Sequence, residues 1–470
     1  MGAEARVQCL AQVRRQLFVR RVEVAECISR ETGKPLAEAL STEVLTGLDM
    51  VRFCERHAPA FLQPARLASS TLAMWRKRLT IARAPYGVVG IISPWNYPFM
   101  LPAGHAMAAL VTGNTVVLKP SELTPLSGAL VGDLCAKAGV PAGVLEVVQG
   151  AGDVGRALVA GAVDKVFFTG SVASGRHVAA ACASRLVPCA LELGGSDPAI
   201  VLHDADLEHA ARGIAWGRFV NAGQTCVAAK RVYVIDAVHD AFVRALEQQV
   251  RQLHLRAPND SSWDVGPLIT AGAVEPISRL REAAVAAGAR VIQPAAPSVL
   301  AGAFPPTLLL DVPAGAAVLT EETFGPLLPV VRVPDEAAAI AAANASPFGL
   351  SASVWSRSRR RARAVAARLH AGSVAINDVT LVAGMADVPH GGVKASGYGR
   401  AHGMAGLEEC VRTKAVVDDI LPSVRQPWWF PYGAALAPLL DGYLRLAHGD
   451  GLGERCSGLV PTLRLLLRRN

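Results

Sequence analysis

The segment VVGIISPWNYPFMLPAGHAMAALVTGNTVVLKP, residues 88–120, combines two short apolar runs with a longer stretch between them. The runs 88–93 and 115–120 are rich in β-branched residues, which is typical of strands buried on both faces of a sheet. A helix is predicted between them, at about 100–112. A strand, a helix and a second strand in this order predict a parallel sheet that is covered by helices.

The same alternation continues towards the C-terminus. Two more strands are predicted at 145–150 and 165–170, and a second α/β region begins at about 193. Its strands, followed by one short final strand, are predicted at 199–204, 231–236, 327–333, 351–356, 373–378 and 414–419. We therefore predict an α/β fold with two sheets.

Two regions precede this alternation. Residues 4–60 carry apolar residues at helical spacing, with Gly33 and Pro35 as interruptions. Residues 66–84 resemble a β-hairpin with a turn at Lys77 and Arg78. The apolar residues predicted to flank that turn are Leu72, Met74, Trp75 and Leu79 to Ile81.

Length and composition limit the class of protein. The 470 residues suffice for two or three domains of roughly 100–200 residues each. Hydrophobic residues make up 51% and charged residues 18%, which excludes global disorder. The net charge of +8 could indicate a nucleic-acid or membrane partner, but most basic residues are spread along the chain. The dense cluster at 357–363 has the pattern of an exposed helix face, and we predict no nucleic-acid partner.

Cysteine usage and the N-terminus indicate a cellular compartment. The nine cysteines are an odd number and include no CxxC pair, so we expect neither a disulfide framework nor a metal site. The N-terminal residues lack the apolar core of a secretory signal. No apolar run reaches the about 18 residues that a transmembrane helix needs. We therefore expect a cytoplasmic protein.

Cys226 is the candidate nucleophile. It lies in RFVNAGQTCVAAKR (218–231), after a helix-like stretch and a short loop at Gly223 and Gln224. A lone cysteine is usually a small buried hydrophobic residue. At such a junction, however, a thiol can be accessible and its pKa lowered, and a thiolate adds readily to a carbonyl carbon.

Glu192 and Asn96 are candidates for a base and an oxyanion donor. Glu192 ends an apolar run in ALELGGSDP (190–198), where it is either a carboxylate satisfied by backbone donors or, with its pKa raised by burial, a base that activates water. Asn96 follows the strand at 88–93, at the strand end where ligands bind in open α/β sheets. Its amide either stabilises an oxyanion or holds the proline-rich turn.

A possible phosphate-binding turn is FTGSVASG (168–175), between a strand and a helix. The backbone N–H groups of Gly170 and Ser171 could bind a pyrophosphate at the helix N-terminus. The spacing G-x-x-x-x-G differs from the dinucleotide pattern GxGxxG, and many strand-to-helix turns contain such residues.

Seven motifs in a fixed order resemble the aldehyde dehydrogenase superfamily, over about residues 10–420. They are PWNYPF (94–99), GNTVVLKPSELTP (113–125), FFTGS (167–171), LELGG (191–195), GQTC (223–226), EETFGPLLPV (321–330) and HGGVKASGYGR (390–400). The resemblance implies a Rossmann-like cofactor domain, an α/β catalytic domain and a small β element. Their expected ranges are 1–65 with 85–192, 193–412, and 66–84 with 413–420, followed by a tail at 421–470. Since relatives pair the β element across a dimer and a lone hairpin is marginally stable, a homodimer or homotetramer is expected.

The resemblance assigns a role to each matching position. Cys226 matches the nucleophile, Glu192 the base that activates the deacylating water, and Asn96 the oxyanion-hole amide that acts with the Cys226 N–H. The expected cofactor residues are Lys119, Ser121 and Glu122 for the adenosine ribose, Gly170 and Ser171 with Trp95 nearby for the pyrophosphate, and Glu322 and Phe324 for the nicotinamide ribose and ring. Glu122 favours NAD because its carboxylate would repel a 2′-phosphate, and Lys119 leaves NADP open.

The implied reaction is NAD(P)-dependent oxidation of an aldehyde to a carboxylic acid. It passes through a thiohemiacetal and a thioester on Cys226, and water activated by Glu192 hydrolyses the thioester. One alternative is a relative that passes the acyl group to coenzyme A, but such relatives usually lack a base at the position of Glu192. Another is a non-catalytic relative, but those tend to lose the nucleophile or the base.

The substrate and the tail stay open. The segment around Cys226 resembles class 3-like members that take apolar or aromatic aldehydes, whereas His390 of HGGVK also occurs in relatives that oxidise aminoaldehydes. In the tail, PWWFPY (427–432), 435–447 and 459–470 could lie on an anionic membrane surface. Acidic residues interrupt the apolar face, which favours packing on its own or a neighbouring subunit instead. They are Asp441, Asp450 and Glu454.

Overall fold

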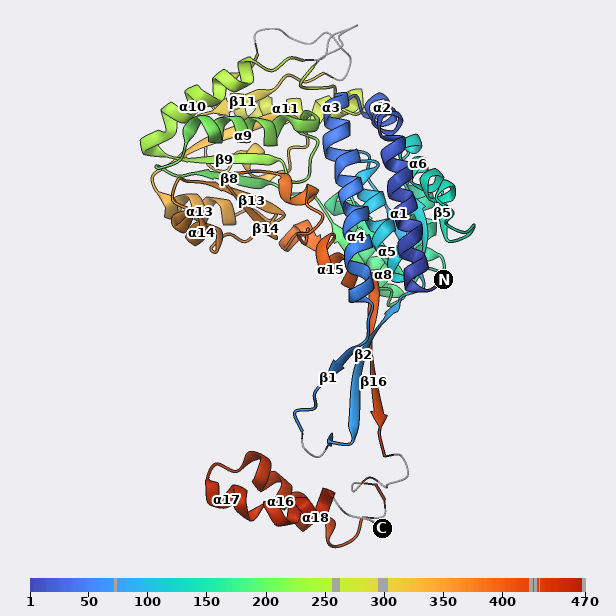
Figure 1. Ribbon diagram of the computed structural model, residues 1–470. Helices are drawn as coiled ribbons and strands as arrows, with labels where there is room; N and C mark the ends of the chain where they lie inside the picture. Colours follow the sequence, from blue (N-terminus) through green and yellow to red (C-terminus); the bar gives the residue numbers. More distant parts are fainter. Residues whose placement is uncertain are drawn as a thin grey trace. The chain divides into compact units, whose positions relative to one another are not determined.

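The computed structural model describes residues 1–71, 74–255, 263–294, 303–421, 426, 429–430 and 432–466. The chain forms two compact units (Figure 1). The larger unit consists of Met1–Leu62 and Ala84–Arg412, and the smaller unit of Gln63–Arg83 and Thr413–Asn470.

The first sheet of the larger unit has six strands in the order β15-β7-β6-β3-β4-β5. The strands are β3 (Val88–Ile92), β4 (Thr115–Lys119), β5 (Leu145–Val147), β6 (Lys165–Thr169), β7 (Cys189–Glu192) and β15 (Gly397–Tyr398). All pair in parallel except β15, which runs antiparallel to β7. The connecting helices are α5 (Met100–Thr112), α6 (Pro125–Lys137), α7 (Gly152–Ala160) and α8 (Val172–Ser184). The strand–helix–strand prediction for residues 88–120 is thus confirmed.

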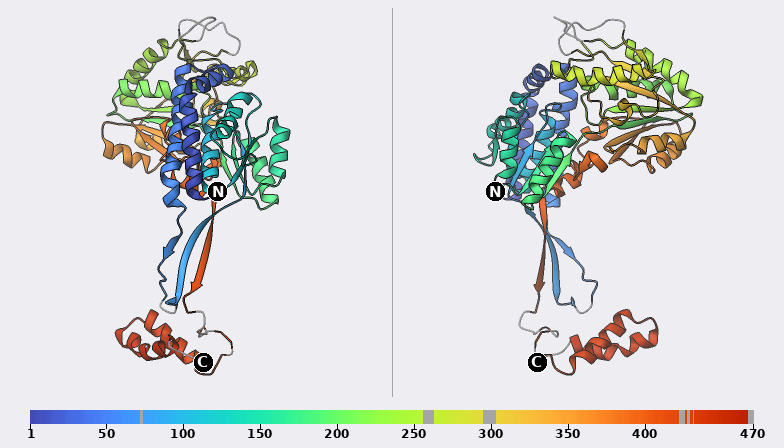
Figure 2. Two further views of the ribbon diagram at one scale, coloured as in Figure 1. Left: turned by 45° about the vertical axis from the view of Figure 1, so that its right-hand side comes forward. Right: turned by 180° about the vertical axis from the view of Figure 1, so that it is seen from behind.

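The N-terminal segment is helical, as its periodicity predicts. Its elements are α1 (Ala3–Val19), α2 (Arg21–Thr32), α3 (Leu36–Glu38), the π-helix η1 (Ala39–Leu45) and α4 (Thr46–Phe61). Helix α2 ends at Gly33, whose φ of 74° suits a residue without a Cβ. Leu10, Val13 and Leu17 are buried in the core that α1 shares with α4 and α5. Figure 2 shows α1 and α4, in blue, side by side in both views.

The second sheet of the larger unit has seven strands in the order β10-β11-β12-β9-β8-β13-β14. The strands are β8 (Asp197–Val201), β9 (Ala229–Ile235), β10 (Arg290–Ile292), β11 (Thr307–Leu310), β12 (Leu327–Val333), β13 (Ser351–Trp355) and β14 (Ser373–Ile376). One face is covered by α9 (Leu207–Phe219), α10 (Asp236–Arg251), α11 (Val274–Ala286) and α12 (Ala317–Thr320), and the other by α13 (Glu336–Asn344) and α14 (Arg359–Ala366) (Figure 1). Both faces are therefore buried, which explains the continuous apolar strands.

Short helices connect these elements. They are η3 (Val220–Gly223), η4 (Ala271–Ala273), η5 (Leu381–Gly384), η6 (Lys394–Ser396) and α15 (Gly403–Glu408). Strand β15, between η6 and α15, comes from late in the chain but completes the six-stranded sheet beside β7. The late segment thereby lies next to the strand that ends in Glu192, because Gly397 pairs with Glu192.

The smaller unit contains a three-stranded sheet in the order β1-β2-β16. Its strands are β1 (Ala65–Leu67), β2 (Lys77–Pro85) and β16 (Val411–Asp419), and β1 pairs antiparallel with β2. The predicted turn at Lys77 and Arg78 is wrong, because both residues lie inside β2. Lys77 can occupy a strand since its ammonium pairs with Asp419 of β16 at 2.9 Å. Leu72 of the predicted hairpin lies outside the described residues.

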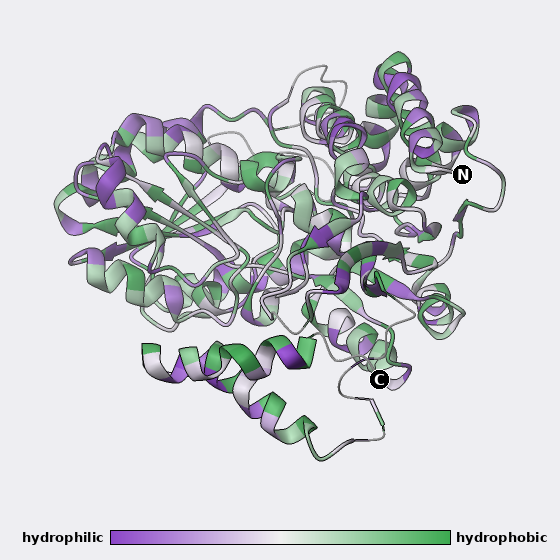
Figure 3. Ribbon diagram, turned by 60° about the horizontal axis from the view of Figure 1, so that its bottom comes forward, coloured by the Kyte–Doolittle hydropathy of each residue, from purple (hydrophilic) through white to green (hydrophobic). Residues whose placement is uncertain are grey.

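The C-terminal tail of the smaller unit forms three short helices, α16 (Leu436–His448), α17 (Leu452–Ser457) and α18 (Leu459–Leu466). Helices α16 and α18 touch at Gly442, where any Cβ would overlap the ring of Pro461. Hydrophobic and hydrophilic residues alternate along these helices (Figure 3). Across the described part of the chain, no helix is both long and apolar enough to cross a membrane. Several tail residues of the predicted membrane-binding motifs, 427–428, 431 and 467–470, lie outside the described residues.

Candidate active site

The loop that carries Cys226 is held in an unusual backbone conformation. Helix α9 ends at Phe219, and Asn221 and Ala222 then both have a φ of 54°. Gly223 follows with a φ of 73°, and a Cβ there would lie 2.5 Å from the Gly325 carbonyl oxygen. The GQTC and EETFG motifs therefore pack directly on each other, although about a hundred residues separate them.

LELGG and EETFG meet in the same way. Any Cβ at Gly194 would overlap the carboxylate of Glu322. That carboxylate accepts a hydrogen bond from Gly195 N at 3.0 Å and from Lys230 Nζ at 2.8 Å. Lys230 Nζ also donates to the Cys226 carbonyl at 2.9 Å, so that Glu322 is tied to the loop of the candidate nucleophile.

The Asn96 side chain is buried and points at the same loop. Its Nδ2 donates to the Gln224 carbonyl at 3.0 Å. A side-chain amide has two N–H donors, so the second remains for a ligand. The backbone carbonyl of Asn96 accepts from Lys34 Nζ and from Asn221 Nδ2, each at 2.9 Å. These bonds fix the backbone of Asn96 beside the Cys226 loop, and the bond to Gln224 orients its side-chain amide.

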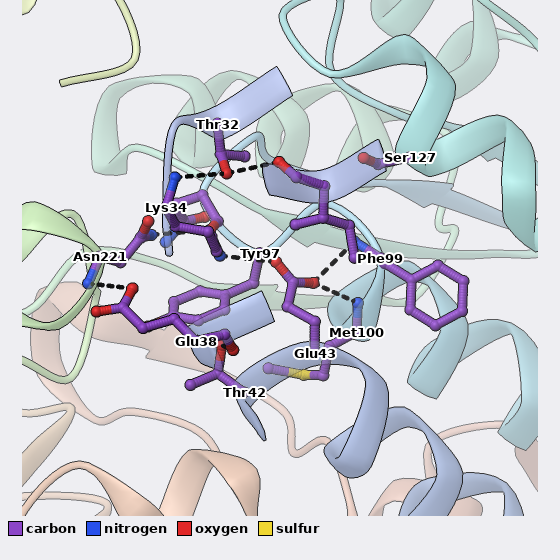
Figure 4. Close-up of polar contacts among 12 residues, drawn as sticks. Thr32, Lys34, Glu38, Thr42, Glu43, Tyr97, Phe99, Met100, Ser127 and Asn221 are labelled. Atoms are coloured by element: carbon purple, nitrogen blue, oxygen red, sulfur yellow. Dashed lines mark hydrogen bonds and ion pairs between the residues drawn. The ribbon is translucent and has the colours of Figure 1, made fainter. Parts of the chain in front are cut away.

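A buried polar network lies behind Asn96 (Figure 4). Lys34 Nζ pairs with Glu43 at 2.8 Å, and both side chains are completely buried. The other oxygen of Glu43 accepts from the backbone N–H groups of Phe99 and Met100, at 3.0 and 2.9 Å. These groups belong to the N-terminus of α5, where an anion is stabilised by unpaired N–H groups and the helix dipole.

The network continues to the residue before Cys226. The Lys34 ammonium lies 4.3 Å from the ring centre of Tyr97, and the Tyr97 hydroxyl bonds with Thr225 Oγ1 at 2.7 Å. Glu38 accepts from Asn221 N at 3.0 Å, and burial raises the pKa of Glu38 to about 7, although Lys34 opposes this shift. The network thus contacts the Cys226 loop at Asn221 and at Thr225.

Cys226 itself differs from its predicted state. Burial raises the pKa of the Cys226 thiol to about 12, and the charge of Lys230 offsets the shift only in part. The prediction of a lowered pKa is therefore wrong, because burial of the thiol outweighs the nearby positive charge of Lys230. The thiol must lose its proton before it can attack.

Glu192 also differs from expectation. It is buried at the end of β7, with Oε2 3.8 Å from His105 Nε2. Burial alone would raise its pKa, but the interaction with His105, with smaller contributions from His390 and His402, outweighs burial and lowers the pKa to about 2. The prediction of a raised pKa is wrong, since it considered burial without these neighbours. Glu192 is an ionised carboxylate at neutral pH.

The predicted nicotinamide residues gather near Cys226. Trp95 and Phe324 meet edge to face, with ring centres 5.6 Å apart. The Lys230 ammonium lies 5.4 Å from the Phe324 ring centre. Glu322 and Phe324 therefore both lie beside Lys230, which donates to the Cys226 carbonyl, and Trp95 packs on Phe324.

One of the predicted adenosine residues, Lys119, lines a cavity of the larger unit. Lys119 is buried and pairs with the half-exposed Glu122 at 3.3 Å. It lines a cavity of about 570 Å³ between α7 and α8, within the size range of small-molecule sites. The Ser121 hydroxyl is close by in sequence and accepts from Leu123 N at 3.3 Å.

Gly170 and Ser171 of the predicted phosphate-binding turn make hydrogen bonds within the protein. The N–H of Gly170 donates to the Glu192 carbonyl at 3.0 Å and so continues the pairing of β6 with β7. The assignment of Gly170 to the pyrophosphate stays a prediction. The Ser171 hydroxyl caps α8 by accepting from Ser174 N at 3.2 Å.

A second cavity, of about 340 Å³, reaches Cys226. Its wall is mostly apolar and includes Leu45, Met100, Leu101, Trp216, Val220, Val227, Leu381, Ala383 and Met385. The described residues that line it include no lysine or arginine, and the only carboxylate among them is Asp49, which is exposed. His390 contributes a polar group to the lining.

Four residues that the sequence did not single out belong to this site: Lys34, Glu43, His105 and Lys230. Only Lys230 had a local signal, because it follows Cys226 by four residues. Lys34 lies in the loop after α2, Glu43 in η1 and His105 in α5, all far from Cys226 in the sequence, and the local sequence around each does not indicate its partner.

The comparisons with known proteins agree with this geometry. A family model described as "Aldehyde dehydrogenase family" matches residues 1–416. The chain is 38% identical to the 4,4'-diapolycopene aldehyde oxidase of Methylomonas sp, over 95% of this chain and 83% of that protein. It is 41% identical to the NADP(+) succinate-semialdehyde dehydrogenase GabD of Escherichia coli, over 83% of this chain and 80% of the other. The solved NAD+ complex of a Bacillus cereus aldehyde dehydrogenase superposes with a TM-score of 0.85 at 33% identity, covering 89% of this chain and 85% of that one.

The chain belongs to the aldehyde dehydrogenase family. It is an oxidoreductase that oxidises an aldehyde with NAD or NADP as the acceptor. The fold predicted from the sequence motifs, with a Rossmann-like region and a catalytic α/β region, is confirmed.

Proposed function

We propose that this enzyme oxidises a large apolar aldehyde to its carboxylic acid through a thioester on Cys226. The observation that carries the proposal is the apolar cavity of about 340 Å³ that reaches Cys226. Burying each methylene of an aliphatic substrate in such a wall contributes about 0.8 kcal/mol. A substrate carboxylate would find no cation in the described lining, which argues against short semialdehyde acids.

The choice between apolar and aminoaldehyde substrates follows from the same cavity. Asp49, the one lining carboxylate among the described residues, is exposed and would remain hydrated beside an ammonium group. The apolar wall of the cavity therefore favours an apolar aldehyde as the substrate. The relative from Methylomonas, whose name describes the oxidation of a diapolycopene aldehyde, supports a long unsaturated aldehyde as one such substrate.

The chemical steps are assigned to three residues. Cys226 loses its proton to solvent water, and its sulfur adds to the aldehyde carbon. Asn96 Nδ2 and the Cys226 N–H stabilise the oxyanion that forms. After oxidation, water attacks the thioester, Glu192 accepts a water proton and the carbon–sulfur bond breaks.

The cofactor supplies the hydride acceptor, and the chain offers residues for both of its ends. Glu322 and Phe324, with Trp95 against the Phe324 ring, would hold the nicotinamide ribose and ring near Cys226. Lys119, Ser121 and Glu122 would hold the adenosine ribose at the cavity between α7 and α8. Gly170 and Ser171 would lie at the pyrophosphate.

The small sheet and the tail give two further parts of the proposal. Strand β16 is an edge of the three-stranded sheet and offers a pairing surface for a second subunit, as in a homodimer or homotetramer.

In the tail, Phe430, Tyr432 and Leu452 expose most of their surface. Apolar and aromatic side chains of this kind bind at membrane surfaces, where a long apolar aldehyde would also partition. Flotation with anionic liposomes tests this part, and protein that stays at the bottom of the gradient would end it.

A panel of aldehydes tests the substrate class. NADH formation is measured with hexanal, decanal, benzaldehyde, succinate semialdehyde and 4-aminobutanal, using Cys226→Ala as the control for the chemistry. We expect kcat/KM to rise about fourfold per added methylene from hexanal towards decanal, since each contributes about 0.8 kcal/mol. Preference for succinate semialdehyde or 4-aminobutanal would refute the apolar proposal. Dependence of turnover on coenzyme A would indicate the acylating alternative, and NAD binding without any turnover the non-catalytic one.

A further inference from the structure

Three histidines from separate parts of the chain surround Glu192. His105 of α5 is the nearest, at 3.8 Å, and its ring stacks on Phe167 with ring centres 4.7 Å apart. His390 and His402 stack on each other with ring centres 5.8 Å apart. Both lie near enough to contribute to the lowered pKa of Glu192.

The backbone holds the last two histidines in place. His390 and Ala401 exchange two backbone hydrogen bonds, of 2.8 and 2.7 Å, which bring His402 beside His390. His402 has a φ of 59° and a ψ of 167°, a conformation that costs a non-glycine residue about 1–3 kcal/mol. The surrounding structure therefore stabilises a strained residue at this position.

Small spaces connect the histidines to the active site. His105 and His402 line one cavity of about 20 Å³, which has room for a single water molecule. His390 lines the substrate cavity together with Cys226. The order in space is thus Glu192, His105, a water-sized cavity, His402 and His390.

Unsatisfied polar atoms occur at both ends of this series. Glu192 Oε1, His390 Nδ1 and His402 Nδ1 are buried and have no hydrogen-bond partner among the described residues. Buried polar atoms without a protein partner are sites where a water molecule can bond. Burial, with the charges of His105 and Arg400, lowers the pKa of His390, and burial with His390 lowers that of His402 to about 3. Both rings are neutral at pH 7, and a neutral imidazole can accept a proton at one nitrogen and release one at the other.

We propose that His105 and His402 carry away the proton that Glu192 takes from the hydrolytic water. The inference rests on the proposed thioester mechanism. In that step the water oxygen bonds to the thioester carbon, one water proton passes to Glu192, and the carbon–sulfur electron pair returns to Cys226. The proton then passes to His105 and, through water in the small cavity, to His402, a residue with some exposed surface. Both histidines act through Glu192 and are positioning residues.

Few other ionisable groups face the cluster. The Cys54 thiol of α4 lines the small cavity, and burial raises its pKa to about 12, so it stays protonated. Arg400 faces His390 and is bound to the carbonyls of Gly392 and Gly399. Neither group can accept the proton at neutral pH, which leaves the histidines.

The test separates hydrolysis of the acyl-enzyme from its formation. Enzyme is mixed with decanal and NAD, quenched at intervals, and the acylated Cys226 peptide is followed by mass spectrometry. The variants are His105→Phe, which keeps the stacking on Phe167, His105→Gln, and His402→Asn, which tolerates a positive φ. His239→Gln is the matched control, because His239 is also buried and paired with an acid, Asp240, but lies on α10.

Acyl-enzyme should form at the normal rate in the His105 variants and decay about 10²-fold more slowly, with added imidazole restoring part of the decay. His402→Asn should slow the decay about tenfold, and His239→Gln should not change it. Decay at the wild-type rate in both His105 variants would overturn the inference. Slowed decay that imidazole does not restore, at any pH, would also overturn it, since it would indicate a structural role. If the wild-type enzyme forms NADH without an acylated Cys226, the proposed function itself fails.

Discussion

Lys34 and Glu43 form a 2.8 Å ion pair in which both side chains are completely buried, and the same ammonium donates to the Asn96 carbonyl at 2.9 Å. The pair links the N-terminal helices to the start of α5 and to the candidate oxyanion donor (Figure 4). Residues far from Cys226 in the sequence therefore help to shape the site of this chain.

Lys34→Met should destabilise the protein by about 3–5 kcal/mol, because it leaves the Glu43 carboxylate buried without its cation. Denaturant unfolding followed by circular dichroism measures this change. Arg14→Met is the control, since its partly exposed pair with Glu55 should contribute no more than about 1 kcal/mol. Equal losses of unfolding free energy in the two variants would contradict a larger contribution from the buried pair.

Alkylation of Cys226 should accelerate with pH. Burial raises the pKa of the thiol to about 12, so the reactive thiolate fraction grows with each step in pH below that value. We expect the rate with iodoacetamide to rise about tenfold per pH unit from about pH 7 to 10. The Cys226 peptide is quantified by mass spectrometry, with Cys226→Ser to correct for the other cysteines. A rate that levels off near neutral pH would contradict the raised pKa.

Glu122→Gln should improve the use of NADP relative to NAD. The carboxylate is half-exposed and would repel a 2′-phosphate, while Lys119 beside it would attract one. Removing one exposed like-charge interaction of at most about 1 kcal/mol should raise kcat/KM for NADP about fivefold. Steady-state kinetics with both cofactors test this, with Glu146→Gln, an exposed carboxylate at β5, as the control. An unchanged NADP to NAD ratio would remove Glu122 from the account of cofactor choice.

Most strands of the two large sheets could be predicted because buried parallel strands are continuous apolar runs, as at 88–93 and 327–333. Strands β10, β11 and β15 were not predicted, since each has at most four residues and its pairing depends on segments distant in the sequence. The turn predicted at Lys77 was wrong, because a lysine whose ammonium is paired with a carboxylate, here Asp419, can lie in a strand.

The active site, too, could be predicted only in part. Cys226, Glu192 and Asn96 were identifiable because motifs mark them, and the structure brings their loops together. The pKa directions of Cys226 and Glu192 were wrong, because each depends on neighbours that no local pattern names, above all His105. The bond from the Gly170 N–H to β7 was not foreseeable from the sequence either.

The most direct test of the account is to trap the thioester. Glu192→Gln should retain Cys226 and form the acyl-enzyme but hydrolyse it slowly. After mixing with decanal and NAD, the Cys226 peptide should gain the mass of a decanoyl group, in an amount equal to the NADH formed. NADH formation with an unmodified Cys226, or an acyl group on another cysteine, would contradict the proposed mechanism.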